Sequence, residues 1–303
     1  MQIKTIKKAI ESKMNAWLLS ITDESLRGKV KDSLLVSGGS ICSMLLNTEV
    51  NDFDVYLKDI NVLIDLAKYY SKPFTNIQIM DGSKKAEYIS EIESEYRTEI
   101  GLLNNAKAIS VRNLKDGQVK LFFDEKNGGM KVNEDVEESK LNFTPLFFSP
   151  NAISLSDKLQ IVLRFTGDAD AIHETFDFIH ATNYFTFENG LSTNKEALES
   201  ILTKQLKYQG SQYPLTSIIR MKKFVIRGWN INAGEILKIM FQISELDLKN
   251  PDVLEEQLIG VDVAYFAVLI SALRGVDGNK ITSQYINAII DKVFNDCDDS
   301  TIK

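Results

Sequence analysis

A turn of small residues between two apolar runs is the feature that most constrains this chain of 303 residues. The turn, Ser37-Gly38-Gly39-Ser40, directly follows the apolar run Leu34-Leu35-Val36, and a short helix-like segment comes after it. A second apolar run then carries two acids, Asp52 and Asp54. Because side chains alternate between the two faces of a strand, both carboxylates are predicted to point the same way. The pattern predicts a strand, a glycine turn, a helix and a second strand, in that order.

Two carboxylates on one face repel each other, and a divalent cation removes that cost. Mg²⁺ prefers oxygen ligands and usually binds substrate phosphates as well as protein carboxylates. A glycine turn ahead of a helix offers bare backbone N–H groups and a positive helix end, which suits a phosphate. We therefore predict that Asp52 and Asp54 hold Mg²⁺ (or Mn²⁺), and that Gly38, Gly39 and Ser40 bind the phosphates of a nucleoside triphosphate (NTP).

These motifs resemble the signature of the polymerase-β-like nucleotidyltransferase superfamily, in which a Gly-Gly or Gly-Ser turn precedes an acid-x-acid pair on the next strand. They look most like the viral and phage members. The spacing is also similar to the start of the head of CCA-adding enzymes and poly(A) polymerases. That head has an Arg-Asp pair where this chain has Cys42-Ser43, which argues against an orthodox CCA-adding enzyme. A turn followed by a solvated strand edge would explain the glycines, but not two acids set among large apolar residues.

The resemblance implies a third acidic ligand. Viral and phage members carry a strand, a glycine-containing turn and a Phe-Asp-Phe element in this order, which transfers the role to Asp177 between Phe176 and Phe178. Asp124 and Glu125, at the end of a predicted strand over 118–124, are the alternative. Asp177 could also be an acid on the exposed face of a helix over 169–183. Since Mg²⁺ prefers oxygen, the nearby histidines are predicted to be surface or hydrogen-bonded residues instead of ligands.

A basic segment near residue 220 is the other candidate site. Arg220, Lys223 and Arg227 fall on one stripe of a predicted helix whose buried side is Met221, Phe224 and Val225. The pattern is similar to the start of the helical lobe in viral nucleotidyltransferases, which implies that the stripe neutralises the triphosphate. A solvated basic face is the alternative.

Composition sets the broad class. The chain is 44% hydrophobic and 25% charged, with a net charge of −7, which is typical of a globular protein and weakens the case for a broad electropositive groove. Two cysteines suggest no disulfide framework, and no run reaches transmembrane length. We expect a cytoplasmic protein, in the bacterial host if it is phage-encoded. The helical spacing of the apolar residues at the start of the sequence predicts an amphipathic helix that packs on the rest of the protein.

The pattern changes from mixed to helical near residue 190. We predict an α+β nucleotidyltransferase head over 1–187, with a mixed sheet and flanking helices, and an α-helical lobe over 188–303. The predicted strands are 33–37, 52–57, 74–80, 107–112, 118–124 and 159–166, and the predicted helices of the head include 40–47, 60–71 and 169–183. In the lobe, the capping-box spacing of Thr193 and Glu196 predicts a helix through about 207, and Pro214 and Gly228 mark the start and the end of another.

The predicted activity is transfer of a nucleoside monophosphate from an NTP to an acceptor hydroxyl, with RNA, either tRNA-like or at a 3′ end, as the favoured acceptor. Nucleotidylation of a protein or a small molecule is one alternative. A catalytically silent nucleotide-binding module is another, against which the retention of both Asp52 and Asp54 argues.

Overall fold

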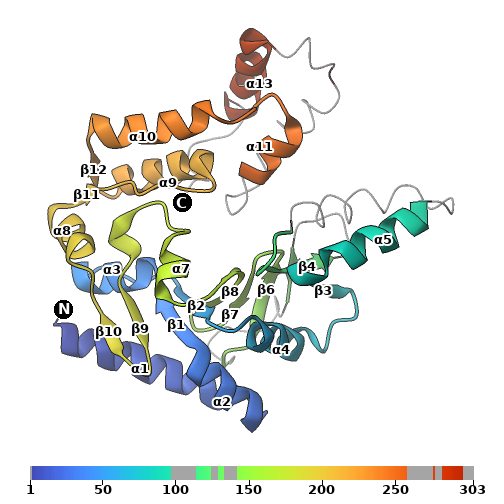
Figure 1. Cartoon of the computed structure of the whole chain (residues 1–303). Helices are drawn as coiled ribbons and strands as arrows, with labels where there is room; N and C mark the ends of the chain where they lie inside the picture. The colour runs from blue at the N-terminus through green and yellow to red at the C-terminus, as the bar shows by residue number, and fades with distance from the viewer. Residues whose placement is uncertain are drawn as a thin grey trace. The chain divides into compact units, whose positions relative to one another are not determined.

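The computed structural model describes residues 2–96, 114–123, 129–132, 142–257, 276 and 282–295 (Figure 1). The chain divides into a first unit, Met1–Thr203, and a second unit, Lys204–Lys303. This division falls later than the boundary at 187/188 that the sequence suggested. The reason is that a β-hairpin after residue 183 and the helix α8 (Lys195–Thr203) pack on elements of the first unit.

The first unit is built on an eight-stranded mixed sheet with the order β10-β9-β1-β2-β8-β7-β6-β5. Its strands are β1 (Leu34–Ser37), β2 (Phe53–Leu57), β5 (Met130–Lys131), β6 (Pro145–Ser149), β7 (Ala152–Leu155), β8 (Leu159–Thr166), β9 (Tyr184–Thr186) and β10 (Gly190–Ser192). Strands β2 and β8 run parallel, and the other neighbouring pairs are antiparallel. A separate antiparallel pair joins β3 (Ile77–Asp81) to β4 (Val119–Phe123). The predicted α+β class with a mixed sheet and flanking helices is confirmed.

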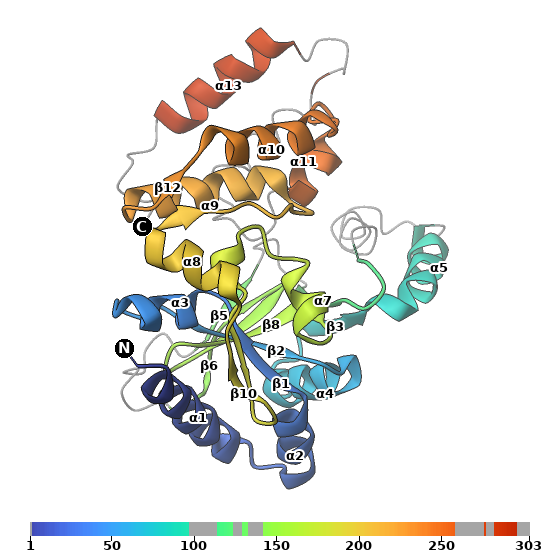
Figure 2. The ribbon, with the colours of Figure 1, turned by 60° about the vertical axis from the view of Figure 1, so that its left-hand side comes forward.

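Helices cover both faces of this sheet (Figure 2). The helices of the first unit are α1 (Ile3–Ser20), α2 (Glu24–Ser33), α3 (Gly39–Leu46), α4 (Ile60–Ser71), α5 (Lys85–Tyr96), α7 (Ala169–His173) and α8, of which α5 lies beside the β3–β4 pair and not on this sheet (Figure 2). One face carries Leu34, Val36, Val55 and Leu57, which share a core with α1 and α4. The other face carries Leu35 and Tyr56, which pack against Ile172 of α7. Alternation along β1 and β2 therefore sends neighbouring residues into two different cores.

The N-terminal helix is an integral part of the core, as the periodicity predicts. Ile6, Ile10, Met14 and Trp17 recur at helical spacing and are fully buried. Trp17 Nε1 donates a hydrogen bond of 2.9 Å to the hydroxyl of Tyr70 on α4. The apolar stripe drives the docking, and this bond satisfies the one polar group that Trp17 takes into the interior.

Several predicted elements of the first unit need correction. The helix expected over 169–183 ends at His173, and a short 3₁₀ helix, η3 (Ile179–Ala181), follows an extended Phe178. The sequence reading missed β5, β6, β7, β9 and β10, which are short or follow no clear alternation. The strand expected over 107–112 lies outside the described residues. The strand expected over 74–80 lies at 77–81 instead.

The second unit is mainly helical in its described parts. Its helices are α9 (Pro214–Ile226), α10 (Ala233–Ser244), α11 (Pro251–Gln257) and α13 (Ser283–Asn295). Pro214 begins α9 and Gly228 follows its end, as predicted, with a positive φ of 80°. A small parallel pair of strands, β11 (Gln205–Leu206) and β12 (Asn230–Ile231), was not foreseen. Within the ranges that the structure describes, no helix has the length and apolarity needed to cross a bilayer.

One cap in the first unit also differs from expectation. The sequence reading placed a capping box at Thr193 and Glu196 and extended the helix to residue 207. The structure caps α8 with Asn194, whose side-chain oxygen accepts from the backbone N–H of Glu196 at 2.9 Å. Helix α8 ends at Thr203. Asparagine and threonine are both good N-cap residues, so local sequence did not decide between adjacent candidates.

Candidate functional site

The glycine turn predicted from the sequence lies between β1 and α3. Gly38 has φ 95° and ψ −153°, and α3 begins at Gly39. Residues with a Cβ atom rarely adopt these backbone angles, so a glycine is required here. A Cβ atom placed on Gly38 would lie 2.9 Å from Oδ2 of Asp54. The turn therefore depends on glycine both for its backbone angles and for room beside the carboxylate.

Register explains why this carboxylate meets the turn. Strands β1 and β2 are antiparallel, and Ser37 lies directly opposite Asp54. Asp54 is half-buried, and Asp52 is exposed immediately before β2 begins at Phe53. Asp54 shares its face of the sheet with Tyr56, on the side covered by α7. One acid of the pair thus belongs to the sheet, and the other lies at its rim.

The three residues predicted to bind phosphate differ in what they expose. Gly39 is exposed, whereas the side chain of Ser40 is buried, and its hydroxyl has no hydrogen-bond partner among the described residues. The Ser40 hydroxyl therefore points into the protein. Any phosphate at this turn would meet the N–H groups at the N-terminus of α3, which have no partners within the helix.

A buried hydrogen-bond network holds the turn from the α7 side. Ser37 Oγ lies 2.9 Å from His173 Nε2 and 3.0 Å from the carbonyl oxygen of Asn183. A hydroxyl has one proton, so if it goes to the Asn183 carbonyl, His173 must donate through Nε2. Gly38 N–H donates to the carbonyl of Ala181 at 3.1 Å. The turn is thus fixed to the segment that follows α7.

Burial sets the charge state of His173. Loss of solvent lowers its pKa below the ordinary value, although nearby Asp170 acts in the opposite direction. The ring also lies beside Phe176 and Tyr184, with centroid separations of 5.3 and 5.6 Å. His173 is therefore a neutral, hydrogen-bonded histidine near pH 7, as the sequence favoured. Its partner Ser37 is 136 residues away, and no local pattern could have indicated this contact.

The Phe176-Asp177-Phe178 element forms a bend beyond α7 and is not helical. Phe176 packs near Tyr56, with ring centroids 6.0 Å apart, on the same face as Asp54. Asp177 is 7% exposed, so it is not the solvated helix acid that the alternative interpretation required. Its charge acts on His180, whose pKa burial nevertheless lowers to about 4.

The predicted carboxylates do not form a complete metal cluster. All three of Asp52, Asp54 and Asp177 lie in described parts of the chain, and these parts contain no group of three or more His, Cys, Asp or Glu side chains placed to hold a metal ion. The alternative third ligands, Asp124 and Glu125, lie outside the described residues. The contact that the structure does provide is the one between the glycine turn and Asp54.

The predicted basic stripe belongs to the second unit. Arg220 and Lys223 are half-buried on α9, and Arg227 is exposed at the C-cap of that helix. Phe224 packs edge-on against the buried Trp229, with centroids 5.8 Å apart. Val225, expected on the buried side, is 47% exposed. The other two residues expected on that side, Met221 and Phe224, are half-buried, so the expected buried side of α9 is found in part.

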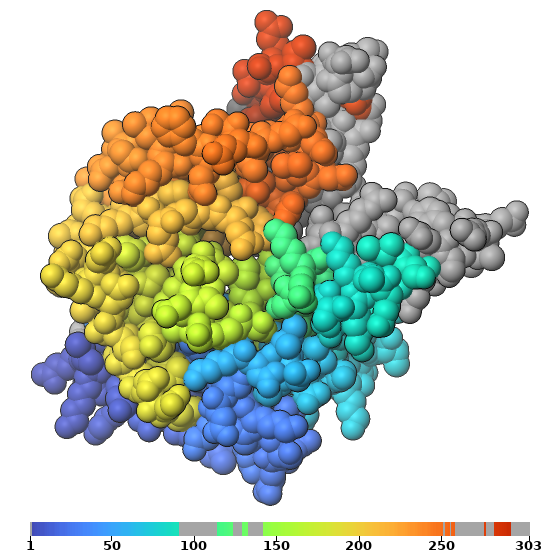
Figure 3. Space-filling view, in the orientation of Figure 1, coloured from blue at the N-terminus to red at the C-terminus, as the bar shows by residue number. Residues whose placement is uncertain are grey.

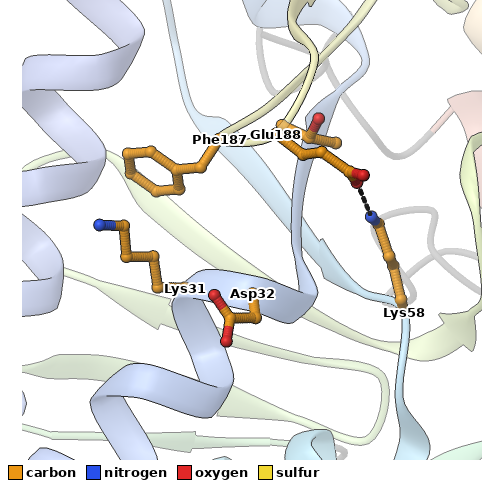
Figure 4. A pocket seen from close by; sticks show the side chains of 6 residues that line it. Lys31, Asp32, Lys58, Phe187 and Glu188 are labelled. Atoms are coloured by element: carbon orange, nitrogen blue, oxygen red, sulfur yellow. Dashed lines mark ion pairs between the residues drawn. The ribbon is translucent and has the colours of Figure 1, made fainter.

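A separate pocket in the first unit lies at the opposite end of the strands from Asp54 (Figure 4). It has a volume of about 410 Å³ and is lined by Lys31, Asp32, Lys58, Thr186, Phe187 and Glu188. Lys58 pairs with Glu188 at 3.5 Å, and the Lys31 ammonium lies 5.3 Å from the centre of the Phe187 ring. Its charges are balanced, so it lacks the excess positive charge that a triphosphate site needs.

Comparison with known proteins assigns the chain to a family. A profile of the Gabija anti-defense 2 (Gad2) family matches residues 8–204, well over half of the chain. This chain belongs to the Gad2 family. The matched region spans nearly all of the first unit, including the Gly38 turn and Asp54.

One curated relative and several solved structures resemble this Gad2 protein. Gabija anti-defense 2 of Bacillus phage SPbetaL7 is 24% identical over 156 residues, which are 47% of this chain and 39% of that protein. The chain thus matches well under half of its relative's length. The Thermotoga maritima CCA-adding enzyme complexed with tRNA has 13% identity and a TM-score of 0.37, covering 88% of this chain and 53% of that one. The Bacillus stearothermophilus CCA-adding enzyme in complex with CTP has 10% identity and a TM-score of 0.37, with coverages of 88% and 56%.

Proposed function

We propose that this chain is a metal-dependent nucleotidyltransferase that moves a nucleoside monophosphate from an NTP to an acceptor hydroxyl. The observation that carries the proposal is the close approach of the Asp54 carboxylate to the Gly38 turn. Helix N–H groups suit a phosphate, and a carboxylate beside them suits the cation that accompanies it. Phosphoryl transfer depends mainly on positioning and on charge stabilisation, which such an arrangement supplies.

The residues at this turn fit Mg²⁺ or Mn²⁺. Magnesium usually takes one or two protein carboxylates and completes its shell with water and substrate phosphates. Asp52 and Asp54 supply hard oxygen ligands of this kind, one exposed and one half-buried. When bound, the ion would activate the acceptor hydroxyl and stabilise the leaving pyrophosphate. Asp177 enters the proposal as a third carboxylate on the sequence resemblance alone.

The chain's own groups would orient the nucleotide. The backbone N–H groups of Gly39 and Ser40 would bind the β- and γ-phosphates. Gly38 has no side chain that would occupy the space beside Asp54. Ser37 and His173 would hold the turn in place through their 2.9 Å contact. Arg220, Lys223 and Arg227 would neutralise triphosphate charge, as the resemblance implies.

The acceptor and the biological setting complete the proposal. The sequence resemblance favours an RNA hydroxyl as the acceptor, with protein and small-molecule acceptors as outcomes of the test. Since the chain belongs to the Gad2 family, we propose that the transfer reaction acts against Gabija defence. This links the Asp54 site to a phenotype that can be scored in cells.

Calorimetric titration of the purified chain with each NTP, once in the presence of Mg²⁺ and once in the presence of EDTA, tests the site. We expect at least one NTP to bind in a Mg²⁺-dependent way, and Asp54→Asn to weaken that binding by roughly tenfold or more. Asp65→Asn, which removes an exposed acid of α4, is the matched control and should bind as the wild type does. Equal Mg²⁺-dependent affinity in Asp54→Asn and wild type would exclude the proposed site.

Phage plating on bacteria that carry Gabija tests the setting. Expression of the wild-type chain should raise plating efficiency, and expression of Asp54→Asn at equal protein level should not. Full protection of the phage by Asp54→Asn would separate the anti-defence role from nucleotidyl transfer.

A further inference from the structure

A groove in the first unit lies between helices α2 and α4 and strand β3. It has a volume of about 750 Å³ and is lined by residues from α2, α4, the turn that follows α4, and β3: Asp23, Ser25, Leu26, Lys29, Asp65, Lys68, Tyr69, Ser71, Lys72, Phe74, Thr75, Ile77 and Ile79. No described residue of β4 contributes to it. The groove therefore follows the edge of β3 that faces away from β4. The surface over α2 and α4 is the blue region in the lower part of Figure 3.

That edge of β3 has no partner strand in the described parts of the chain. Three hydrogen bonds show which residues point their backbone toward it. Gly82 N–H donates to the carbonyl of Gln118, on the β4 side, whereas Asp81 N–H points away from β4 and donates to the Tyr88 hydroxyl. On β4, Leu121 lies opposite Ile79, and its N–H points away from β3 to the carbonyl of Pro150. Alternation in an antiparallel ladder then directs the N–H and C=O groups of Ile77 and Ile79 to the open edge. These are the groups that a further strand would pair with.

The charge and the floor of the groove describe what fits there. Lys29, Lys68 and Lys72 are exposed along it. The acids opposing them are Asp65 and Asp23, and Asp23 caps α2 by accepting from the N–H of Leu26 at 2.9 Å. The groove thus has an excess of positive charge in a chain whose net charge is −7.

Apolar side chains form the floor below these lysines. Ile77, Ile79 and Phe74 are half-buried, and Leu26 is 7% exposed. The side chains of a strand laid beside β3 would point alternately to its two faces. One set would contact this apolar floor and the helices α2 and α4.

We propose that this groove binds an extended acidic peptide segment of a partner protein, which adds as a strand to the edge of β3 that has no partner strand among the described residues. Backbone pairing at Ile77 and Ile79 supplies the strand-to-strand hydrogen bonds, and the lysines select acidic side chains. A nucleic acid could contact the lysines, but it would not form strand-to-strand hydrogen bonds with the N–H and C=O groups of β3. The inference is independent of the proposed transfer reaction, because the groove and the Gly38 turn share no residue.

Fluorescence polarisation with the full chain tests the proposal. The probe is a fluorescein-labelled ten-residue peptide of Glu-Val repeats. Two matched probes are the same peptide with alternate backbone amides N-methylated and a Lys-Val peptide of equal length. A labelled single-stranded RNA decamer is the fourth probe. The charge-reversed variant is Lys68→Glu with Lys72→Glu, and its matched control is Lys4→Glu with Lys8→Glu, another exposed pair one turn apart on α1.

The Glu-Val peptide should bind the wild type and the α1 control equally, and the groove variant roughly tenfold more weakly. The N-methylated and Lys-Val peptides should not bind. Failure of the Glu-Val peptide to bind, or equal binding of its N-methylated form, would overturn the proposal. The proposal would also be overturned if the RNA binds the wild type and the α1 control but not the groove variant, while the peptide does not bind. The groove would then be a nucleic-acid surface. None of these results depends on nucleotidyl transfer.

Discussion

The Asp54 carboxylate occupies the space into which a side chain on Gly38 would project, with Oδ2 2.9 Å from the position of a Cβ atom. This contact joins two motifs that are separate in the sequence. It arises because β1 and β2 pair with Ser37 opposite Asp54, so that the turn following β1 meets the beginning of β2. The φ of 95° requires glycine at position 38, and the close approach gives the turn a carboxylate as its immediate neighbour.

Replacing Gly38 by alanine should therefore damage both stability and the site. The added methyl group would meet Oδ2 of Asp54, and the residue would keep a φ of 95° that costs an L-amino acid about 1–3 kcal/mol. We expect Gly38→Ala to lower the free energy of unfolding by at least this amount, measured by urea denaturation, and to abolish Mg²⁺-dependent NTP binding.

Gly39→Ala is the matched control for this change. Gly39 begins α3, and a Cβ atom on it meets nothing within 4 Å. Alanine also favours the helix, so stability should stay the same or rise by up to about 1 kcal/mol. Equal unfolding free energies for Gly38→Ala and wild type would contradict the account of the turn.

Acid should destabilise the first unit through His180. Burial lowers the pKa of this histidine from 6.5 to about 4, so the unfolded chain binds more protons between these values. Stability that is present above pH 6.5 should fall as the pH drops toward 4, by about 3 kcal/mol from this group. The neutral variant His180→Gln should lack this part of the decline. Urea denaturation of both proteins from pH 7.5 to 4 measures the difference, and parallel curves would show that His180 does not titrate in this way.

The docking of α1 predicts a strong contrast along one helix. Ile10 is fully buried, whereas Leu19 is 74% exposed. Ile10→Ala should lower the unfolding free energy by about 2–5 kcal/mol because it leaves a cavity in the core. Leu19→Ala should change it by less than about 0.5 kcal/mol. Thermal or urea denaturation compares the two. A small effect of Ile10→Ala would mean that α1 does not belong to the cooperative fold.

Local patterns predicted the parts of the fold that local physics decides. The apolar stripe from Ile6 to Trp17 identified α1, and the run before Ser37 identified β1. Pro214 and Gly228 marked the ends of α9, because proline suits the first helical turn and glycine suits the positive φ after the last. Strand alternation predicts one shared face for Asp52 and Asp54, but only Asp54 lies within β2, so the shared face stays a prediction.

Contacts between distant residues were beyond the sequence. The hydrogen bond from Ser37 to His173 spans 136 residues, and no spacing rule connects them. The helix expected through Asp177 fails because Thr175 and Phe176 close turns onto Ile172 and His173, and the chain then extends at Phe178. The burial of the Ser40 hydroxyl depends on how α3 packs, which its own residues do not reveal. Whether Asp177 is a metal ligand stays a prediction.

The central claim is that the Gly38–Asp54 site transfers a nucleotide, and label transfer tests it most directly. Wild-type protein and Asp54→Asn are incubated with each α-³²P-labelled NTP, Mg²⁺ or Mn²⁺, and total host RNA and protein. We then measure label in the two macromolecular fractions, with Asp65→Asn as the control. The account predicts metal-dependent label in the wild type and in Asp65→Asn, in the RNA fraction, and none in Asp54→Asn. Equal labelling by Asp54→Asn, or no labelling by the wild type with any NTP in either fraction, would contradict it.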